Sequence, residues 1–530
     1  MSGIDDQTRI EQSRRNTWLT WVGIHSRMTP DAEAFNYLGE STSWSRLQEN
    51  IERAADGFAR RGVGFGDRVM IITLNCTEFI ETVLAVNTLG AIAVPVNFRL
   101  APPELAYLVT DCEPKLVVTD AMLAPLVGAI RAEGADPGEH IVIGGEPGTE
   151  GQTPFAEMLA ESGESRGVVD VPEDTPALIM YTSGTTGRPK GAVLTYENMT
   201  AQSLTCIRVF GLFDQNGRGL CAAPMFHIAA LGAIAPSLQL GTATVVAPLR
   251  EFDPAATLDL LAVEKITTVF LVPVQWQAVC AEQQARPREL SLENISWGAA
   301  PATDTILRAM AETFPDARNS AVFGQTEMSP ITCSLDGDEA LRKLGSVGRV
   351  IPTIEARVVD DFMEDVAAGE VGEIVYRGPT LMQGYWNKPQ ETADAFAGGW
   401  FHSGDLVRMD DEGFVYVVDR KKDMIISGGE NIYCAEVENA LAGHPRVLEA
   451  AVIGRKDEKW GEVPVAVVAQ RPDESGASDL TLDELTEWLR DHLASYKLPK
   501  DLVVVDALPR NASGKIVKHQ LRSEHGTVGV

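Results

Sequence analysis

Short apolar runs alternate with amphipathic segments along much of the chain. The runs are rich in β-branched residues and have the length of strands, whereas apolar positions in the other segments recur at helical spacing. The strand-like runs are residues 68–73, 91–96, 115–120, 266–273 and 320–324, and the helix-like segments are residues 77–90, 102–112 and 306–314. Succession of strand, helix and strand is typical of parallel sheets covered by helices. The pattern predicts the α/β fold class, with layered α/β subdomains in a large N-terminal domain.

After residue 354 the pattern changes to short strands separated by glycine-rich turns. A succession of helix, two strands, helix and strand follows over residues 434–506, and Thr481 with Glu484 is placed as a capping box for its second helix. We therefore expect a small α+β domain at the C-terminal end. The predicted boundaries are 1–419 for the large domain, 420–423 for a hinge and 424–530 for the small domain. The charged residues of the hinge suit an exposed pivot, and an ordinary solvated turn is the alternative.

Composition narrows the class of protein. With 530 residues and 45% hydrophobic content, the chain can bury the cores of more than one domain. A formal net charge of −30 disfavours non-specific binding to nucleic acid or to an anionic membrane surface. Any bound anion must therefore be met by local cations and backbone amides. The seven cysteines are scattered without a CxxC pair, which favours buried reduced thiols and a cytoplasmic location.

Two segments bear on export and membranes. Residues 1–16 lack the apolar core of a signal peptide. Residues 220–240 are long enough to span a bilayer, but Pro224, His227 and Pro236 interrupt them, so we expect a buried segment and no transmembrane helix. Peripheral association with a membrane stays open.

The segment YTSGTTGRPKG, residues 181–191, directly follows a strand-like run at residues 177–181. Its glycines can expose successive backbone amides, and four hydroxyl side chains and the Lys190 ammonium add further donors. Such a loop can hold a phosphate chain. It is not the Walker pattern, because Pro189 stands five positions after Gly184 where that pattern needs glycine. A surface turn without a ligand is the alternative.

Three further stretches offer groups that a nucleotide needs. Residues 323–327, FGQTE, supply an aromatic face, a hydroxyl and a hard carboxylate ligand for Mg²⁺. Residues 297–301, WGAAP, supply small residues against which a flat ring can lie, and Asp405, expected in a turn, can accept from two ribose hydroxyls. Lys515 follows a glycine near the C-terminus and can join these groups only if the small domain folds over the cleft.

The ordered motifs YTSGTTGRPKG, PMFH, WGAAP, FGQTE, GYW, WFHSGD, DRKKDMIISGGENIY and PRNASGK resemble those of the adenylate-forming, or AMP-binding, superfamily. That superfamily includes acyl-CoA synthetases, luciferases and the adenylation domains of peptide synthetases. The resemblance covers roughly residues 21–518. Residues 508–515 and 458–468 are most similar to actinobacterial, especially mycobacterial, fatty-acyl-CoA ligases. The resemblance implies an AMP-forming acid–thiol ligase that uses ATP, Mg²⁺ and coenzyme A, with an ATP- and acyl-binding large domain and a mobile C-terminal lid.

The resemblance also implies residue roles in ATP binding. Lys515 contacts the carboxylate and the α-phosphate, Thr326 holds the α-phosphate, and Glu327 with Thr182 holds the metal. Phe323 stacks on adenine, where the family usually has tyrosine, and Asp405 with Arg420 binds ribose. The expected ATP-binding set is Thr182, Ser183, Gly184, Thr185, Thr186, Gly187, Lys190, Gly298, Ala299, Ala300, Pro301, Phe323, Gly324, Gln325, Thr326, Asp405, Arg420 and Lys515. At Ala299 the family more often has a second glycine.

The second step needs a different set of residues. By resemblance, Lys422 is the hinge residue, and rotation there brings Ser427, Gly428 and Gly429 to the pantetheine tunnel of CoA. An ordinary tight turn is the alternative for the two glycines. Acyl-AMP ligases that load carrier proteins share the ATP motifs, so the CoA acceptor is an expectation.

The acid is predicted to be a fatty acid. The acyl pocket implied by resemblance consists of His227, Ile228, Leu231, Trp297 and Met328, with His227 as a gate or, alternatively, a core-packed histidine. No carboxylate stands at residues 224–235 to pair with a substrate ammonium, and aryl or other carboxylic acids stay open. A nucleotide-binding regulator without catalysis is the alternative from another class. A homodimer is an open expectation, as is an acetyltransferase and deacetylase pair acting on Lys515.

Overall fold

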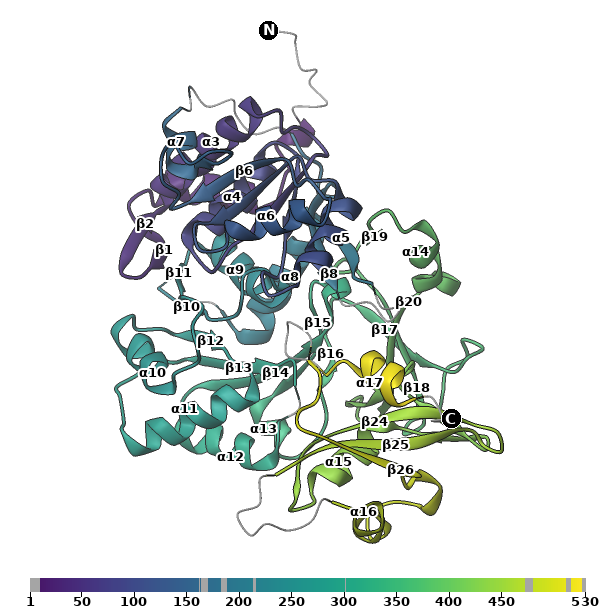
Figure 1. Cartoon of the computed structure of the whole chain (residues 1–530). Helices are drawn as coiled ribbons and strands as arrows, with labels where there is room; N and C mark the ends of the chain where they lie inside the picture. The colour runs from purple at the N-terminus through teal and green to yellow at the C-terminus, as the bar shows by residue number, and fades with distance from the viewer. Residues whose placement is uncertain are drawn as a thin grey trace. The chain divides into compact units, whose positions relative to one another are not determined.

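The computed structural model describes residues 10–161, 163, 170–182, 188–212, 216–300, 302–471, 480–510 and 516–526. These residues form two compact units (Figure 1). The first unit comprises the described residues up to 355 together with 377–401, and the second comprises 356–376 and the described residues from 402 onward. The predicted hinge at 420–423 lies inside the second unit, and the boundary between moving domains stays a prediction.

An eight-stranded sheet in the first unit has the order β19-β9-β8-β4-β3-β5-β6-β7. Its strands are β3 (Arg68–Ile72), β4 (Ile92–Pro95), β5 (Leu116–Asp120), β6 (Glu139–Ile143), β7 (Thr153–Pro154), β8 (Pro176–Thr182), β9 (Lys190–Thr195) and β19 (Gly384–Tyr385). β3 pairs in parallel with β4 and with β5, as the sequence pattern predicted. The connecting helices are α4 (Thr77–Thr88) and α5 (Pro102–Cys112). β8 and β9 pair antiparallel, so they form a hairpin at this side of the sheet.

A nine-stranded sheet in the same unit has the order β16-β15-β14-β13-β12-β10-β11-β1-β2. β12 (Thr268–Phe270), β13 (Asn294–Gly298) and β14 (Arg318–Gly324) are parallel neighbours, which places the ends of β13 and β14 at one edge. α12 (Asp304–Thr313) and α9 (Ile228–Leu240) are among its helices. Its remaining strands are β10 (Arg218–Cys221), β11 (Ala243–Val246), β1 (Glu33–Tyr37), β2 (Glu40–Ser43), β15 (Ile331–Asp336) and β16 (Arg349–Val350).

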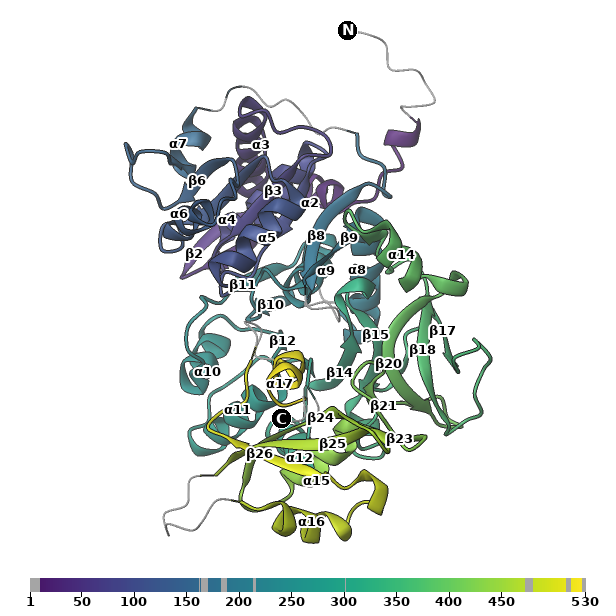
Figure 2. The same ribbon diagram turned by 45° about the vertical axis from the view of Figure 1, so that its right-hand side comes forward.

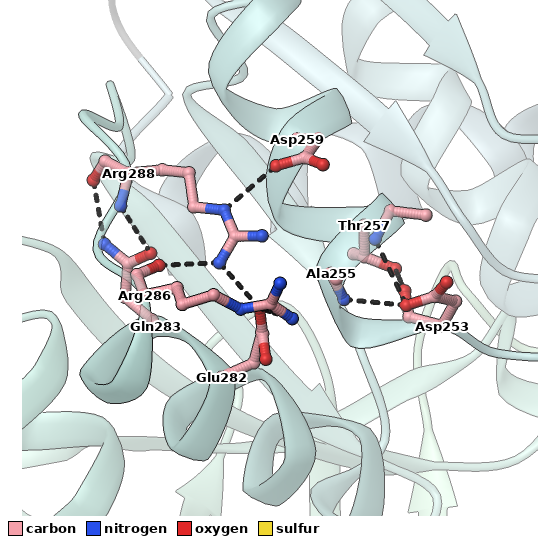
Figure 3. A network of polar contacts seen from close by, with 9 residues as sticks. Asp253, Ala255, Thr257, Asp259, Glu282, Gln283, Arg286 and Arg288 are labelled. Atoms are coloured by element: carbon pink, nitrogen blue, oxygen red, sulfur yellow. Dashed lines mark hydrogen bonds and ion pairs between the residues drawn. The ribbon is translucent and has the colours of Figure 1, made fainter.

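Two neighbouring helices of this layer, α10 (Pro254–Val263) and α11 (Pro273–Ala285), are joined by a polar network (Figure 3). Arg288 donates from Nε to Asp259 of α10 at 2.9 Å and from Nη1 to Glu282 of α11 at 2.8 Å. Gln283 closes the network, because its amide exchanges two hydrogen bonds with the Arg288 backbone. The turn after α11 is therefore fixed to α10.

The second unit contains two sheets. The first has the order β17-β18-β20-β21, with strands β17 (Glu355–Val359), β18 (Val371–Arg377), β20 (Phe401–Met409) and β21 (Val415–Arg420). The other has the order β23-β22-β25-β24, with β26 beside β25. Figure 2 shows β24, β25 and β26 next to one another. Its strands are β22 (Ile425–Ser427), β23 (Glu430–Ile432), β24 (Val447–Asp457), β25 (Gly461–Gln470) and β26 (Asp501–Val505), and its helices are α15 (Cys434–Ala442), α16 (Leu482–Arg490) and α17 (Lys518–His525). The predicted α+β arrangement is confirmed, and Thr481 accepts from the Glu484 amide at the start of α16.

The cysteines and the long apolar segment follow the expectations from composition. The seven cysteines are all free and buried. The segment 220–240 ends in the interrupted helix α9, and among the residues that the structure describes no helix is long and apolar enough to cross a membrane.

Candidate functional site

The two ends of the predicted phosphate loop face each other across the β8–β9 hairpin. Thr182 is the last residue of β8, Lys190 is the first residue of β9, and the two are paired in the ladder. The hydroxyl and the ammonium that the sequence assigned to phosphate binding therefore start from adjacent backbone positions. Ser183, Gly184, Thr185, Thr186 and Gly187, which stand between them, lie outside the described residues.

Glu327 lies next to this hairpin. It is in the short 3₁₀ helix η1 (Thr326–Met328), with 8% of its surface exposed. Its Oε1 accepts from the Thr182 hydroxyl at 3.3 Å and from the Tyr385 hydroxyl at 3.1 Å. The structure thus brings together the two residues that the sequence proposed as metal ligands. A carboxylate beside hydroxyl oxygens is the hard donor set that Mg²⁺ prefers, so these residues fit that ion.

Tyr385 is a site residue that reasoning from the sequence missed. The GYW motif that contains it was recognised, but no role was given to its tyrosine. β19, which ends at Tyr385, pairs antiparallel with β9, and the Lys190 ammonium lies 5.0 Å from the centre of the Tyr385 ring. The signal that could have found it is the position of GYW among motifs that each supply polar groups.

The expected adenine platform is at the ends of β13 and β14. Gly298 is paired with Val322, so it stands beside Phe323, which is half-buried. A Cβ on Gly298 would lie 2.3 Å from the Val322 carbonyl oxygen, and one on Gly324 would lie 1.7 Å from the Pro330 carbonyl oxygen. No side chain fits at either glycine without a backbone shift. The two strand ends therefore keep bare backbone beside the Phe323 ring, as stacking of a flat base requires.

Ala299 adopts a left-handed backbone conformation with φ 65°. This conformation favours glycine, which gives a physical reason for the glycine that the family more often has there. Ala300, its neighbour, is exposed, Gln325 and Thr326 are partly exposed, and Pro301 lies outside the described residues.

The expected acyl-pocket residues differ in burial. Ile228, Leu231 and Met328 are buried, and Trp297 is 7% exposed with its indole donating to Asn319 at 3.0 Å. His227 is exposed and caps α9, with Nδ1 accepting from the Ala229 amide at 3.3 Å. The alternative of a core-packed histidine is therefore wrong. Its role as a gate stays a prediction.

The second unit holds the expected ribose pair. Asp405 and Arg420 are opposite each other on β20 and β21, and they form an ion pair at 2.7 Å. The placement of Asp405 in a turn was wrong, because it lies within β20. It is 2% exposed, and Arg420 also donates to the Ser403 carbonyl. Pairing with Arg420 fixes the orientation of the carboxylate, as recognition of a diol needs.

Gly428 and Gly429 form the two-residue turn between β22 and β23, with Ser427 paired to Glu430. Both glycines have positive φ, 61° and 88°, so the hairpin itself requires them. A Cβ on Gly428 would lie 2.7 Å from the ring of Trp460, an exposed residue to which the sequence motifs gave no role. The tight-turn alternative is confirmed as geometry, and a role in CoA binding stays a prediction.

The expected hinge residue Lys422 is exposed in the turn after β21. The next residue, Asp423, forms an ion pair with Arg522 of α17 at 2.6 Å, and Lys518 of α17 pairs with Glu438 of α15 at 2.7 Å. α17 begins three positions after Lys515, which itself lies outside the described residues. The helix that follows the predicted catalytic lysine is thus tied to the hinge segment within the second unit.

Comparison with known proteins identifies the family of the chain. It matches the AMP-binding enzyme family over residues 24–386 and the AMP-binding enzyme C-terminal domain over residues 436–515. It is 39% identical to the feruloyl-CoA synthase of an Amycolatopsis species, over 97% of this chain and 100% of that one. It is 35% identical to the long-chain-fatty-acid–CoA ligase FadD13 of Mycobacterium tuberculosis, over 96% of this chain and 98% of that one.

Solved structures give the same result. The o-succinylbenzoate CoA synthetase MenE of Bacillus subtilis, in complex with its acyl-adenylate intermediate, has a TM-score of 0.83 at 31% identity, over 95% of this chain and 97% of that one. The same enzyme in complex with ATP and magnesium ion has a TM-score of 0.82 at 30% identity, over 95% of this chain and 99% of that one.

The chain therefore belongs to the AMP-binding enzyme family. Its class is the AMP-forming acid–thiol ligase, as the ordered motifs predicted. The predicted cofactors are confirmed for this class, since the relatives are CoA ligases and one of them holds ATP with magnesium.

Proposed function

We propose that the enzyme joins a hydrophobic carboxylic acid to coenzyme A, with a fatty acid as the first candidate and an aryl acid as the second. The observation that supports this proposal is the apolar character of the expected acyl-pocket residues: Ile228, Leu231 and Met328 are buried, and no carboxylate stands at residues 224–235. Burial of methylene groups rewards an alkyl or aryl acid, whereas a charged amine would need a partner. Similarity to a feruloyl-CoA synthase at 39% identity supports the aryl candidate.

The first half-reaction forms an acyl-adenylate. A carboxylate oxygen attacks the α-phosphorus of ATP, and the bond to the bridging oxygen breaks so that pyrophosphate leaves. Two anions must approach one another, and their repulsion at about 4 Å amounts to several kcal/mol at intermediate effective dielectric. In this proposal Lys515 and Thr326 stabilise the charge at the α-phosphate, and Lys190 with the loop amides binds the departing phosphates.

Magnesium would be held by Glu327, with Thr182 as a second oxygen donor. The ion supplies charge neutralisation at the phosphate oxygens. The chain itself orients the carboxylate of Glu327. Thr182 and Tyr385, from two separate segments of the chain, both donate to its Oε1. The adenine base would lie on Phe323, whose phenyl ring replaces the more usual tyrosine without loss of the stacking face.

In the second half-reaction the CoA thiolate attacks the acyl carbonyl and AMP leaves. Lys515 cannot occupy the same space as the thiol, so the C-terminal part must rotate at Lys422 between the two steps. Ser427, Gly428 and Gly429 would then flank the pantetheine arm. Loading of a carrier protein is the alternative acceptor. AMP release with purified CoA alone supports the CoA acceptor, and AMP release only after addition of a holo carrier protein contradicts it.

The acid is identified by a substrate profile. AMP and pyrophosphate formation is measured with saturated acids of increasing length, benzoates and hydroxycinnamates, each with ATP, Mg²⁺ and CoA. The fatty-acid proposal expects kcat/KM to rise with chain length, by up to about fourfold for each fully buried methylene. A maximum at hydroxycinnamates with flat, low rates for alkyl acids would replace it with the aryl candidate. ATP binding without pyrophosphate release for all acids would contradict both.

A further inference from the structure

Asp111, at the end of α5, holds together two chain segments that lead into the nucleotide site. Its side chain is 4% exposed. Tyr181 donates its phenolic proton to Oδ2 at 2.7 Å, and Lys388 donates from Nζ to Oδ1 at 2.6 Å. The Asn387 side chain also donates to the Asp111 backbone carbonyl at 3.1 Å. Asp111 therefore uses both carboxylate oxygens and its backbone carbonyl to join two segments to α5. These segments are β8 and the residues after β19, and both lie close to α5 in Figure 1.

The two tethered segments carry the two donors to Glu327. Tyr181 directly precedes Thr182, and Lys388 stands three positions after Tyr385. Thr182 and Tyr385 donate to the same Oε1 of Glu327. One end of each segment is thus fixed by Asp111, and the other end presents a hydroxyl to the proposed metal-binding carboxylate.

The charge states suit a permanent tether. The Tyr181 hydroxyl is the donor in its hydrogen bond, and the carboxylate oxygen of Asp111 accepts. The hydrogen bond to Asp111 raises the pKa of Lys388, which therefore stays an ammonium. The turn between Tyr385 and Lys388 needs support, because Asn387 has a positive φ of 52°. Asparagine tolerates this conformation, and its side-chain bond to Asp111 holds it.

We propose that Asp111 is a positioning residue for the nucleotide site: through Tyr181 and Lys388 it sets the placement of Thr182 and Tyr385 around Glu327, and thereby the affinity for the magnesium–triphosphate group. The inference rests on the proposed function, in that Thr182 and Glu327 hold the metal. It adds a residue, 70 positions before Tyr181 in the chain, that acts through Tyr181 and Lys388. Residues that orient metal ligands in this way typically change metal affinity or activity by about ten- to a hundredfold when they are replaced.

The test measures binding separately from turnover. The full-length enzyme is titrated by calorimetry, without any acid, with the α,β-methylene analogue of ATP, in which the bond that adenylation breaks cannot be cleaved. The ratio of the dissociation constant without Mg²⁺ to the dissociation constant with Mg²⁺ is compared among variants. A ratio from one sample cancels any loss of folded protein. Asp111→Asn keeps the shape of the side chain but removes its charge, and it should reduce the ratio by about tenfold. Tyr181→Phe and Lys388→Met each break one tether and should each reduce it by a smaller factor.

Asp259→Asn is the matched control. It also removes a carboxylate from a cationic partner in the same unit, but the Arg288 network on α10 and α11 has no contact with Glu327 among the bonds drawn in Figure 3. This variant should leave the ratio at the wild-type value even if its thermal midpoint falls. Pyrophosphate formation and thioester formation from supplied acyl-adenylate are then measured. Asp111→Asn should slow the first about tenfold and change the second less than about twofold.

The outcomes separate the two proposals. Wild-type binding of the analogue without any dependence on Mg²⁺ would overturn the metal role of Thr182 and Glu327, and the inference with it. A magnesium-dependent wild type with an unchanged ratio in Asp111→Asn, Tyr181→Phe and Lys388→Met would overturn the positioning role alone. Equal losses in both half-reactions would show that Asp111 only stabilises the fold.

Discussion

The hydroxyl of Tyr385 lies 3.1 Å from Oε1 of Glu327, the same oxygen that accepts from Thr182. Tyr385→Phe keeps the ring next to Lys190 and removes only this donor. We expect pyrophosphate formation to fall about tenfold, because the buried carboxylate loses part of its orientation. Thioester formation from supplied acyl-adenylate should stay within about twofold of wild type. A variant with unchanged kinetics for both steps would mean that Thr182 alone orients Glu327.

Lys515 is expected to act in the first half-reaction only. Lys515→Ala should lower the rate of acyl-adenylate formation by about two to three orders of magnitude, since a cation at the developing charge is lost. Lys518→Ala is an unsuitable control, because Lys518 is ion-paired to Glu438 and supports the fold. Lys500→Ala is the better one, because Lys500 is an exposed residue directly before β26. Rapid-quench measurement of each half-reaction tests the division, and parallel losses in both would contradict it.

Ala299 holds a conformation that costs about 1–2 kcal/mol for a residue with a Cβ. Glycine removes that cost but adds about 0.5–1 kcal/mol of chain entropy on folding. The first effect is larger, so Ala299→Gly should stabilise the first unit by roughly 0.5–1 kcal/mol.

Ala300→Gly is the matched control for this prediction, because Ala300 has no positive φ and gains only the entropic cost. It should destabilise by about 0.5–1 kcal/mol. Chemical unfolding followed by tryptophan fluorescence compares the two. If both variants changed the free energy of unfolding in the same direction, backbone strain at Ala299 would be negligible.

Glu81 makes the stability of the first unit depend on pH. Burial raises the pKa of this carboxyl from 4.5 to about 7, even though Asn50 donates to it at 2.7 Å. The pKa of Glu81 in the folded state lies above its pKa in the unfolded state. The contribution of protonated Glu81 to the free energy of unfolding is therefore fully present below about pH 4.5 and is lost as the pH rises from there through 7. The loss amounts to something on the order of 3 kcal/mol when complete.

Glu81→Gln should therefore unfold at higher denaturant concentration than wild type at about pH 8 and show little difference near pH 4.5. Glu157→Gln, on an exposed face of α7 (Phe155–Ala160), should leave the denaturant midpoint unchanged at both pH values. Unfolding curves at the two pH values measure both. If the denaturant midpoints of wild type and Glu81→Gln differed by the same amount at both pH values, ionisation of Glu81 would not be the cause of the pH dependence.

The sequence predicted the parallel core and the order of the motifs, because apolar runs of strand length and helical periodicity are local signals. β3, β4 and β5 were found in this way, and so was α16 with its cap at Thr481. The cap could be predicted because Thr481 and its partner Glu484 stand within one turn of each other in the chain.

The rest depended on contacts between residues distant in the chain. Nothing near Asp111 distinguishes it from other acidic residues at helix ends, since its partners Tyr181 and Lys388 are brought to it only by the sheet. Asp405 was expected in a turn because glycine precedes it, yet Gly404 takes its positive φ of 70° within a strand. Similarly, β1 joins β11 by parallel pairing between segments far apart in the chain, a pairing that no local pattern encodes.

The β8–β9 ladder has a consequence for redesign of the loop. Thr182 and Lys190 form one rung of a hairpin, so the strands, and not the ligand, decide how far apart the two attachment points stand. A loop lengthened or shortened between them would begin and end at unchanged coordinates. The residues between Thr182 and Lys190 can therefore be exchanged together to fit a longer or shorter polyphosphate, while Thr182 and Lys190 are kept.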